Sequence, residues 1–188
     1  FRFSDSVRIH GIPCLISRTG YTGEDGVEIY LRPEYASELW QYLLETGRKY
    51  GLKPAGLGCR DTLRFEACLP LYGHELTEDI TPMEASLGSF VRMEKPDFIG
   101  KQALAEQAEK GVSRKLTGFE MTDRGIPRSG YEIRKGGRHA GVVTTGYFSP
   151  SLGKNLGLAL IDASLSEPGN SLEVQIRGKA AHGVTVPT

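Results

Sequence analysis

The pattern of hydrophobic and polar residues predicts three short strands at the start of the chain. Residues 1–9 alternate weakly, residues 12–17 form a second run and residues 27–31 a third. A period of two is typical of strands that bury one face. Residues 18–26, between the second and third strands, hold three glycines. They predict a tight turn or a close approach of the backbone to another group.

A helical period follows these strands. Pro33 suits a helix start, and apolar residues then recur at i, i+3, i+4, i+7 and i+8, as in a surface helix with one apolar stripe. A short helix is expected over residues 59–69, because Pro70 stops it. Another is expected over residues 98–110, and residues 86–93 are interpreted as a further strand. The stripe consists of Ala36, Leu39, Trp40, Leu43 and Leu44.

The last third of the chain has a different pattern, with short strands separated by turns. Residues 135–138 read Lys-Gly-Gly-Arg, a plausible hairpin turn, and residues 172–176 alternate strictly. Six or so strands over ~75 residues predict a small antiparallel barrel or sandwich. We therefore expect an α+β fold with two domains: an antiparallel sheet with helices over residues 1–111, then a small antiparallel β-barrel over residues 112–188. The expected strands of the second domain are residues 116–121, 131–134, 139–144, 156–161, 172–176 and 183–186.

Composition narrows the classes of function. The 188 residues are 39% hydrophobic and 24% charged with a formal net charge of zero, which argues against disorder and against a nucleic-acid partner. No apolar stretch is long enough for a membrane span. The three cysteines form no C-x-x-C pair, so we expect buried thiols in a reducing compartment and neither a disulfide framework nor a zinc site. There is no signal peptide, and the chain begins with Phe, so we expect a piece of a longer protein.

Common catalytic motifs are missing from the sequence. The segment Gly56-Leu-Gly58 fails as a dinucleotide fingerprint, because Asp61 stands at the third glycine position. Ser149-Pro-Ser151 lacks the glycines of a nucleophile elbow. The four histidines are scattered without the spacing of metal ligands, so no metal site is expected.

Glu28 is the first candidate for ligand binding. It stands between Val27 and Ile29 in a predicted strand, so its side chain points away from both. If those two face a core, Glu28 faces either solvent or a cleft. In a cleft, its two oxygens suit a ligand with adjacent N–H donors. Tyr21, seven residues earlier, offers an aromatic face or a hydroxyl.

Arg60 and Arg64 form a second candidate pair. They are four residues apart and therefore share one face of the predicted helix. Two guanidinium groups on that face suit a ligand that carries carboxylates. The alternative is ordinary ion pairing with Asp61 or Glu66, or an ion pair of Arg60 with Glu28 that only joins helix and strand.

Seven motifs follow one another along the chain: SRTGYTGEDGVEIY, GLGCRDTLRFEACLPLYGHEL, TPMEASLG, DFIGKQAL, LTGFEM, GYFSPSLGKNLGLALID and GNSLEVQIRGK. In this order they resemble the C-terminal half of the glycine cleavage T-protein family, the folate-dependent aminomethyltransferases. The first four resemble its folate-binding domain and the last three its C-terminal barrel. The folate domains of dimethylglycine and sarcosine dehydrogenases share parts of the pattern, but LYGHELTEDITPMEASLG favours the T-proteins.

The resemblance implies a reaction and a set of site residues. Family members take an aminomethyl group from the lipoyl arm of the H-protein, release ammonia and pass the one-carbon unit to tetrahydrofolate, in the cytoplasm or, in eukaryotes, the mitochondrial matrix. Glu28 matches the family's pterin-binding glutamate, Tyr21 its pocket tyrosine and Arg60 its folate-binding arginine. Arg64 is included among the expected folate-binding residues, although it and Glu66 are equally suited to locking the helix in place.

Departures from the family pattern limit these expectations. Cys59 and Cys68 stand where the family has Ala and Gly. The family's catalytic aspartate belongs to an N-terminal half that has no counterpart here, and a further pocket residue follows the Val-Pro-Thr with which this chain ends. We therefore expect no catalytic residue in the chain, no activity of the chain alone and weak folate binding. The alternative is a non-catalytic folate-binding relative that supports iron–sulfur protein assembly.

Overall fold

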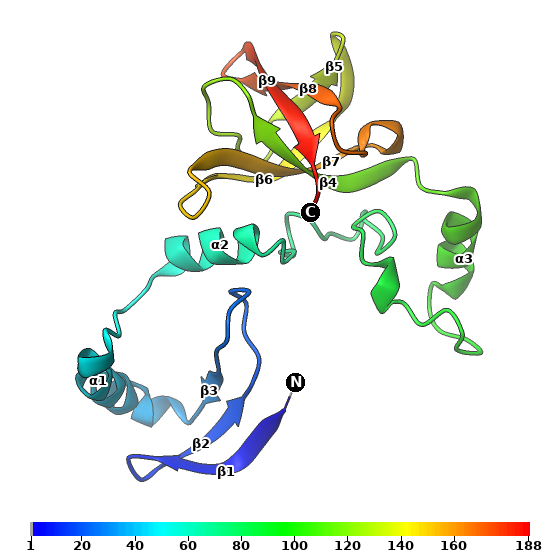
Figure 1. Ribbon diagram of the computed structural model, residues 1–188. Coiled ribbons are helices and arrows are strands. Elements are labelled where there is room, and N and C mark those ends of the chain that lie inside the picture. The colour runs from blue at the N-terminus through cyan, green and yellow to red at the C-terminus, as the bar shows by residue number, and fades with distance from the viewer. Residues whose placement is uncertain (1) are drawn as a thin grey trace. The chain divides into compact units, whose positions relative to one another are not determined.

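The computed structural model describes residues 2–188; the predicted first strand began at Phe1, which lies outside the described residues. The chain packs as two compact units, Phe1–Leu69 and Pro70–Thr188. In Figure 1 the first runs from blue to cyan and the second from green to red.

A three-stranded antiparallel sheet begins the first unit. It contains β1 (Phe3–Ile9), β2 (Ile12–Ser17) and β3 (Glu28–Tyr30), in that order across the sheet. The three predicted strands are confirmed, although the third is shorter than expected. Ser17 pairs with Glu28, so the glycine-rich segment between β2 and β3 leaves and re-enters the sheet at neighbouring positions.

Helix α1 (Ala36–Gly47) packs on this sheet after a single turn of 3-10 helix, η1 (Pro33–Tyr35). Leu39 forms a small core with Ile12 and Cys14 of β2. The predicted helix is confirmed, but its stripe is narrower than expected. Trp40 is 50% exposed, because Leu39 and its neighbours one turn on already cover the sheet.

Helix α2 (Leu57–Glu66) follows a second 3-10 turn, η2 (Arg48–Tyr50). It begins two residues earlier than predicted and ends before Pro70 is reached. Cys68 has a φ of +53°, a left-handed conformation that stops the helix, so Pro70 is not what ends it.

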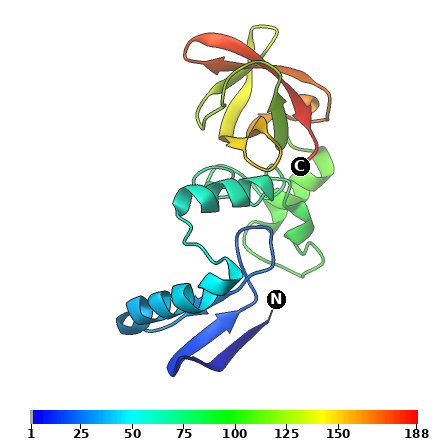
Figure 2. The same ribbon diagram turned by 60° about the vertical axis from the view of Figure 1, so that its left-hand side comes forward.

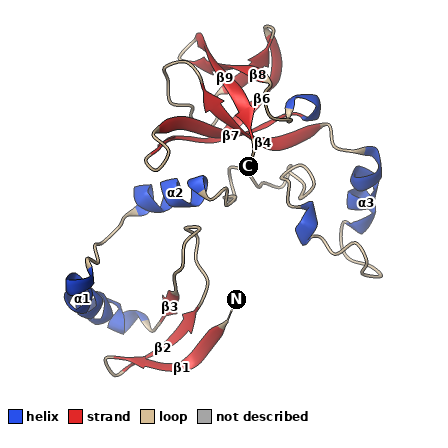
Figure 3. Cartoon of the chain, in the orientation of Figure 1, coloured by secondary structure: helices blue, strands red, loops and turns tan. Residues whose placement is uncertain are grey.

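The second unit starts with a long stretch that has little regular structure, up to helix α3 (Lys101–Lys110). Figure 3 draws most of it as loop. The strand predicted over residues 86–93 is wrong: Ser86 has a φ of +60°, and a 3-10 turn, η3 (Gly88–Phe90), follows. The amide of Val91 donates to the carbonyl of Gly88, a local bond that replaces a strand partner.

A closed antiparallel barrel makes up the rest of the second unit, as Figure 2 shows from one side. The strands follow each other around it in the order β4-β7-β6-β5-β8-β9, with a 3-10 turn, η4 (Ala163–Leu165), after β7. The prediction of a small antiparallel barrel is confirmed. Closure gives every strand two neighbours, so no edge is left to pair with another chain. The strands are β4 (Arg114–Met121), β5 (Glu132–Lys135), β6 (Arg138–Ser149), β7 (Lys154–Asp162), β8 (Ser171–Ile176) and β9 (Lys179–Val186).

Alternating side chains from all six strands fill the barrel. Phe119 of β4 and Ile133 of β5 are fully buried, and so is Val174 of β8, in the run whose alternation predicted a strand. Gly157 of β7 makes room for the Phe119 ring, since a Cβ there would lie 2.3 Å from that ring. A side chain this large fits the narrow barrel because its neighbour has none.

Candidate functional site

Glu28 lies at the exposed beginning of β3, and two hydroxyl groups hold its carboxylate. Thr19 and Tyr30 both donate to the same oxygen, Oε2, the second at 3.0 Å. The other oxygen, Oε1, has no hydrogen bond to any residue in the range 2–188. The side chain is therefore fixed through one oxygen, and the other is available to a ligand donor.

These hydroxyl groups also set the charge of the site. The hydrogen bond from Thr19, and then that from Tyr30, lowers the pKa of Glu28, because both bonds favour the ionised carboxylate. The same contact raises the pKa of Tyr30, whose neutral form is the donor. At neutral pH the site thus presents a carboxylate anion beside a neutral phenol.

Arg60 and Tyr21 lie against each other in the same unit. The guanidinium carbon of Arg60, near the start of α2, is 4.7 Å from the centre of the Tyr21 ring. A guanidinium stacked on an aromatic ring keeps its N–H edge available to acceptors. Arg60 is exposed and makes no ion pair among the described residues, so the stack presents an uncompensated positive charge.

A glycine brings the Tyr21 segment close to α2. Gly23 has a φ of +74°, and a Cβ at that position would lie 2.5 Å from the Cβ of Ala67 at the end of α2. The backbone therefore both turns and approaches another element here, the two roles that the glycine-rich sequence predicted as alternatives.

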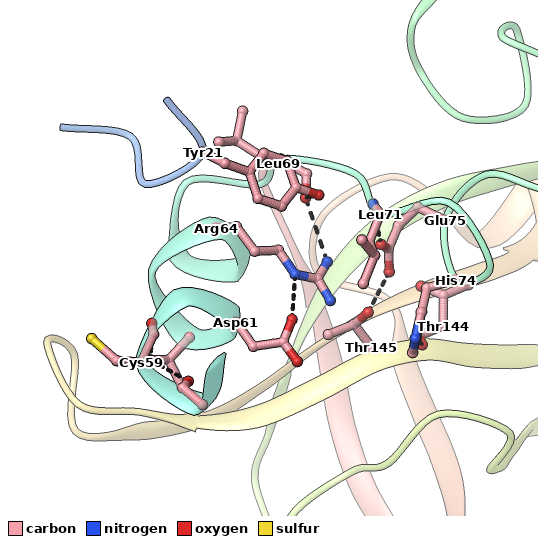
Figure 4. Close-up of polar contacts among 12 residues, drawn as sticks. Tyr21, Cys59, Asp61, Arg64, Leu69, Leu71, His74, Glu75, Thr144 and Thr145 are labelled. Atoms are coloured by element: carbon pink, nitrogen blue, oxygen red, sulfur yellow. Dashed lines mark hydrogen bonds and ion pairs between the residues drawn. The ribbon is translucent and has the colours of Figure 1, made fainter. Parts of the chain in front are cut away.

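Arg64 has a different environment from Arg60, one helical turn away. Its side chain is fully buried, with Nε donating to Asp61 at 2.9 Å and Nη1 donating to the carbonyl oxygen of Leu69 at 3.4 Å. The Tyr21 hydroxyl donates to that same carbonyl at 3.4 Å, and Figure 4 shows the ring beside Leu69. Arg64 thus ties the end of α2 to the chain that follows, while Arg60 on the same helix faces out.

The predicted site residues are therefore only partly brought together. Tyr21 meets Arg60, whereas Glu28 is held by Thr19 and Tyr30. An ion pair between Arg60 and Glu28 is absent among residues 2–188, so that structural alternative is wrong. Thr19 and Tyr30 were not among the residues that the sequence pattern predicted for the site. Tyr30 was detectable, because residues two apart in a strand share a face.

A buried carboxylate marks the second unit. Glu75 is fully buried; it accepts the amide of Leu71 at 3.0 Å and the hydroxyl of Thr145 in β6 at 2.6 Å (Figure 4). Nδ1 of the adjacent His74 lies 3.0 Å from the carbonyl oxygen of Thr144. The LYGHE motif therefore binds the irregular stretch before α3 to β6 of the barrel. The sequence gave no indication of this role.

The cysteines are free thiols. Cys14 is buried as expected, but Cys59 and Cys68 are exposed, so the expectation of buried thiols is wrong for these two. Although Cys68 as a residue is exposed, the atoms packed around its thiol desolvate it and raise its pKa. Across residues 2–188, no group of His, Cys, Asp and Glu side chains is arranged to hold a metal ion, and no helix combines the length and apolar character that crossing a membrane requires.

Two family models match the chain. Residues 1–95 match the GCVT N-terminal domain, and residues 114–188 match the glycine cleavage T-protein C-terminal barrel domain. The chain belongs to the glycine cleavage T-protein family. The two models leave residues 96–113 between them, and the domain boundary after residue 111 stays a prediction.

Relatives within the T-protein family are similar over almost the whole chain. An aminomethyltransferase of Thermoanaerobacter pseudethanolicus is 62% identical over 95% of this chain and 49% of its own length. One of Geobacillus sp. is 54% identical over 100% of this chain and 52% of its own length. The solved aminomethyltransferase T of the Bartonella henselae glycine cleavage system superposes with a TM-score of 0.85 at 35% identity, over 92% of this chain and 48% of that one. The chain thus spans about half the length of the relatives it matches.

Proposed function

We propose that this chain is the folate-binding part of an aminomethyltransferase that transfers a one-carbon unit from a lipoylated H-protein to tetrahydrofolate, with release of ammonia, in cytoplasmic glycine cleavage. Residues 1–111 would contribute to the folate domain and residues 112–188 would form its barrel. No described residue favours the alternative, a non-catalytic folate-binding relative. The similar proteins named above, which are aminomethyltransferases, support the enzyme.

The carboxylate of Glu28 carries the proposal. It is ionised at neutral pH, its Oε2 is already held by Thr19 and Tyr30, and its Oε1 is unpaired among the described residues. The pterin rim of tetrahydrofolate presents N–H donors side by side, which is the chemistry that such a carboxylate binds. A side chain held in place before binding loses less entropy when the ligand arrives.

Arg60 and Tyr21 supply the complementary group. The exposed guanidinium suits the carboxylates of a folate, and the Tyr21 ring restricts its orientation. Arg64 belongs to the same proposed site through α2: its buried bonds to Asp61 and Leu69 hold the helix on which Arg60 stands. The chain's own residues thus bind and orient the folate, and none of them is assigned the proton transfer of the reaction.

The test is titration calorimetry with 5-formyltetrahydrofolate, a stable analogue, on the 188-residue chain. Glu28→Gln removes the charge at almost unchanged size, and Glu28→Ala removes the acceptor. We expect both to weaken binding roughly tenfold or more, the range of a charge-assisted hydrogen bond. Glu24→Gln is the matched control, because Glu24 is an exposed carboxylate in the same segment whose side chain makes no hydrogen bond to residues 2–188. Equal affinities for wild type and Glu28→Ala would refute the role of Glu28.

An activity assay tests the second part of the proposal. The catalytic aspartate that the family resemblance implies has no match among these residues, so the 188-residue chain should turn over aminomethylated H-protein far more slowly than a full-length relative. Turnover at a comparable rate would show that the chain carries its own catalytic group.

A further inference from the structure

A hollow of about 240 Å³ lies in the second unit, next to β6. Its size suits a small molecule and not a drug-sized ligand. None of the residues around it is acidic, and it is lined by His74, Arg128, Ser129, Thr145, Gly146 and Tyr147.

The loop that carries Arg128 is fastened to β6. Pro127 is fully buried, and its carbonyl oxygen would lie 2.4 Å from a Cβ at position 146, so only Gly146 allows this contact. The amide of Gly130 donates to the carbonyl of Val143 at 2.8 Å on the far side of the loop. Arg128 thus projects from a backbone that is held at both ends.

The guanidinium of Arg128 is positioned but not neutralised. Its centre lies 5.4 Å from the centre of the Tyr147 ring, and Nη1 makes a long bond of 3.4 Å to the carbonyl of Gly146. No carboxylate of residues 2–188 lies within ion-pair distance of it. Glu75, the residue after His74, is fully buried and accepts the hydroxyl of Thr145, which itself lines the hollow. The Arg128 guanidinium therefore has more N–H donors than acceptors at the edge of a polar cavity.

We propose that this hollow, the Arg128 pocket, binds one carboxylate group of a small organic acid. The planar guanidinium fork matches a carboxylate, and its stacking on Tyr147 fixes the plane while its N–H edge stays available. Ser129, which has no side-chain partner among the described residues, adds a hydroxyl donor. One permanent cation balances one carboxylate. A phosphate ester carries more charge and normally meets several cations or a run of backbone amides.

The experiment is an amide NMR titration of the 188-residue chain with glutarate and, separately, with its neutral analogue glutaramide. Glutarate should shift the amides of residues 128–130 and 145–147 in a saturable manner, and glutaramide should leave them in place. Arg128→Gln should weaken glutarate binding roughly tenfold or more, in the range of a charge-assisted bond. Arg128→Lys, which keeps the charge but loses the fork, should bind with intermediate affinity.

Arg124→Gln is the matched control, since Arg124 is an exposed arginine of the same loop without a side-chain contact in the structure. It should bind glutarate like the wild type. The proposal is overturned if Arg128→Gln binds as well as wild type, if Arg124→Gln weakens binding equally, or if inorganic phosphate binds the pocket more tightly than glutarate. None of these measurements involves a folate, so the outcome is independent of the function proposed above.

Discussion

The ring of Tyr21 supports the guanidinium of Arg60, with 4.7 Å between the guanidinium carbon and the ring centre. The two residues are 39 positions apart in the sequence, and Gly23 and Ala67 bring their segments together through a contact that admits no further side-chain atom. The stack holds an exposed arginine in one orientation, which would otherwise sample many rotamers. It is the contact through which the glycine-rich segment and α2 form one candidate site.

Replacing Tyr21 should weaken folate binding through Arg60. A cation–π contact at an exposed position contributes about 0.5–1 kcal/mol, so Tyr21→Leu should reduce affinity for 5-formyltetrahydrofolate by roughly two- to fivefold. Tyr21→Phe keeps the ring and should retain most of the affinity. Tyr50→Leu is the control, because Lys49 lies over the Tyr50 ring at 4.9 Å in an exposed pair that the proposed site does not use. Calorimetric affinities that fall equally for Tyr50→Leu would contradict the prediction.

Replacing Arg64 should affect stability before it affects binding. The buried guanidinium satisfies Asp61 and the Leu69 carbonyl, so Arg64→Ala leaves both without this donor and should cost about 2–4 kcal/mol in the free energy of unfolding. Urea unfolding followed by the fluorescence of Trp40, the single tryptophan, reports on the first unit. Arg48→Ala removes an exposed arginine whose side chain makes no hydrogen bond or ion pair within residues 2–188, and should change little. A stable Arg64→Ala variant with lost folate affinity would instead point to direct ligand contact.

Glu84 should make the second unit sensitive to acid. Burial alone would raise the pKa of Glu84. Hydrogen bonds from Arg114 at 2.7 Å and from the Thr81 amide at 2.9 Å outweigh burial, so the pKa of Glu84 is lowered from the ordinary value of 4.5. A lowered pKa in the folded state means that the stabilisation is complete above pH 4.5 and is lost as the pH falls through the lowered value.

Glu84→Gln should therefore destabilise the second unit by about 1 kcal/mol near neutral pH, a figure reduced because Arg114 is partly exposed. The difference from wild type should shrink below pH 4.5. Urea unfolding followed by circular dichroism at several pH values measures it. Glu78→Gln serves as the reference, because Glu78 is exposed and its side chain has no hydrogen bond or ion pair with any described residue. A difference in unfolding free energy between Glu84→Gln and wild type that stays constant down to low pH would show that the charge of Glu84 does not stabilise the second unit.

Gly146→Ala should destabilise the barrel. The added methyl group would lie 2.4 Å from the carbonyl oxygen of Pro127, and that backbone can move only by loosening the loop held by Gly130. The expected cost is about 1–3 kcal/mol in thermal or urea unfolding. Gly58→Ala is the comparison, because nothing lies within 4 Å of its added Cβ and alanine favours a helix. Equal stability of Gly146→Ala and wild type would show that the loop yields easily.

Elements with a clear period were predictable from the sequence. The apolar run over residues 12–17 predicted β2 with its observed ends. Strict alternation located β8 to within one residue, because a strand that buries one face alternates. The strand expected over residues 86–93 failed because a left-handed Ser86 breaks the extended backbone, a conformation that no hydrophobic pattern reveals. The C-terminal end of α2 came earlier than predicted for a similar reason, the left-handed Cys68.

The sequence by itself determined the family, the barrel and the residue types available to a folate, because these depend on long ordered motifs and on local periodicity. Only the tertiary structure decided how each candidate is used. Arg60 and Arg64 lie on the same helix and carry the same charge. Arg60 is exposed and stacks on an aromatic ring, whereas Arg64 is buried and donates a hydrogen bond to a backbone carbonyl. Spacing along the chain says which side chains share a face. What that face meets depends on packing between segments that are distant in the sequence.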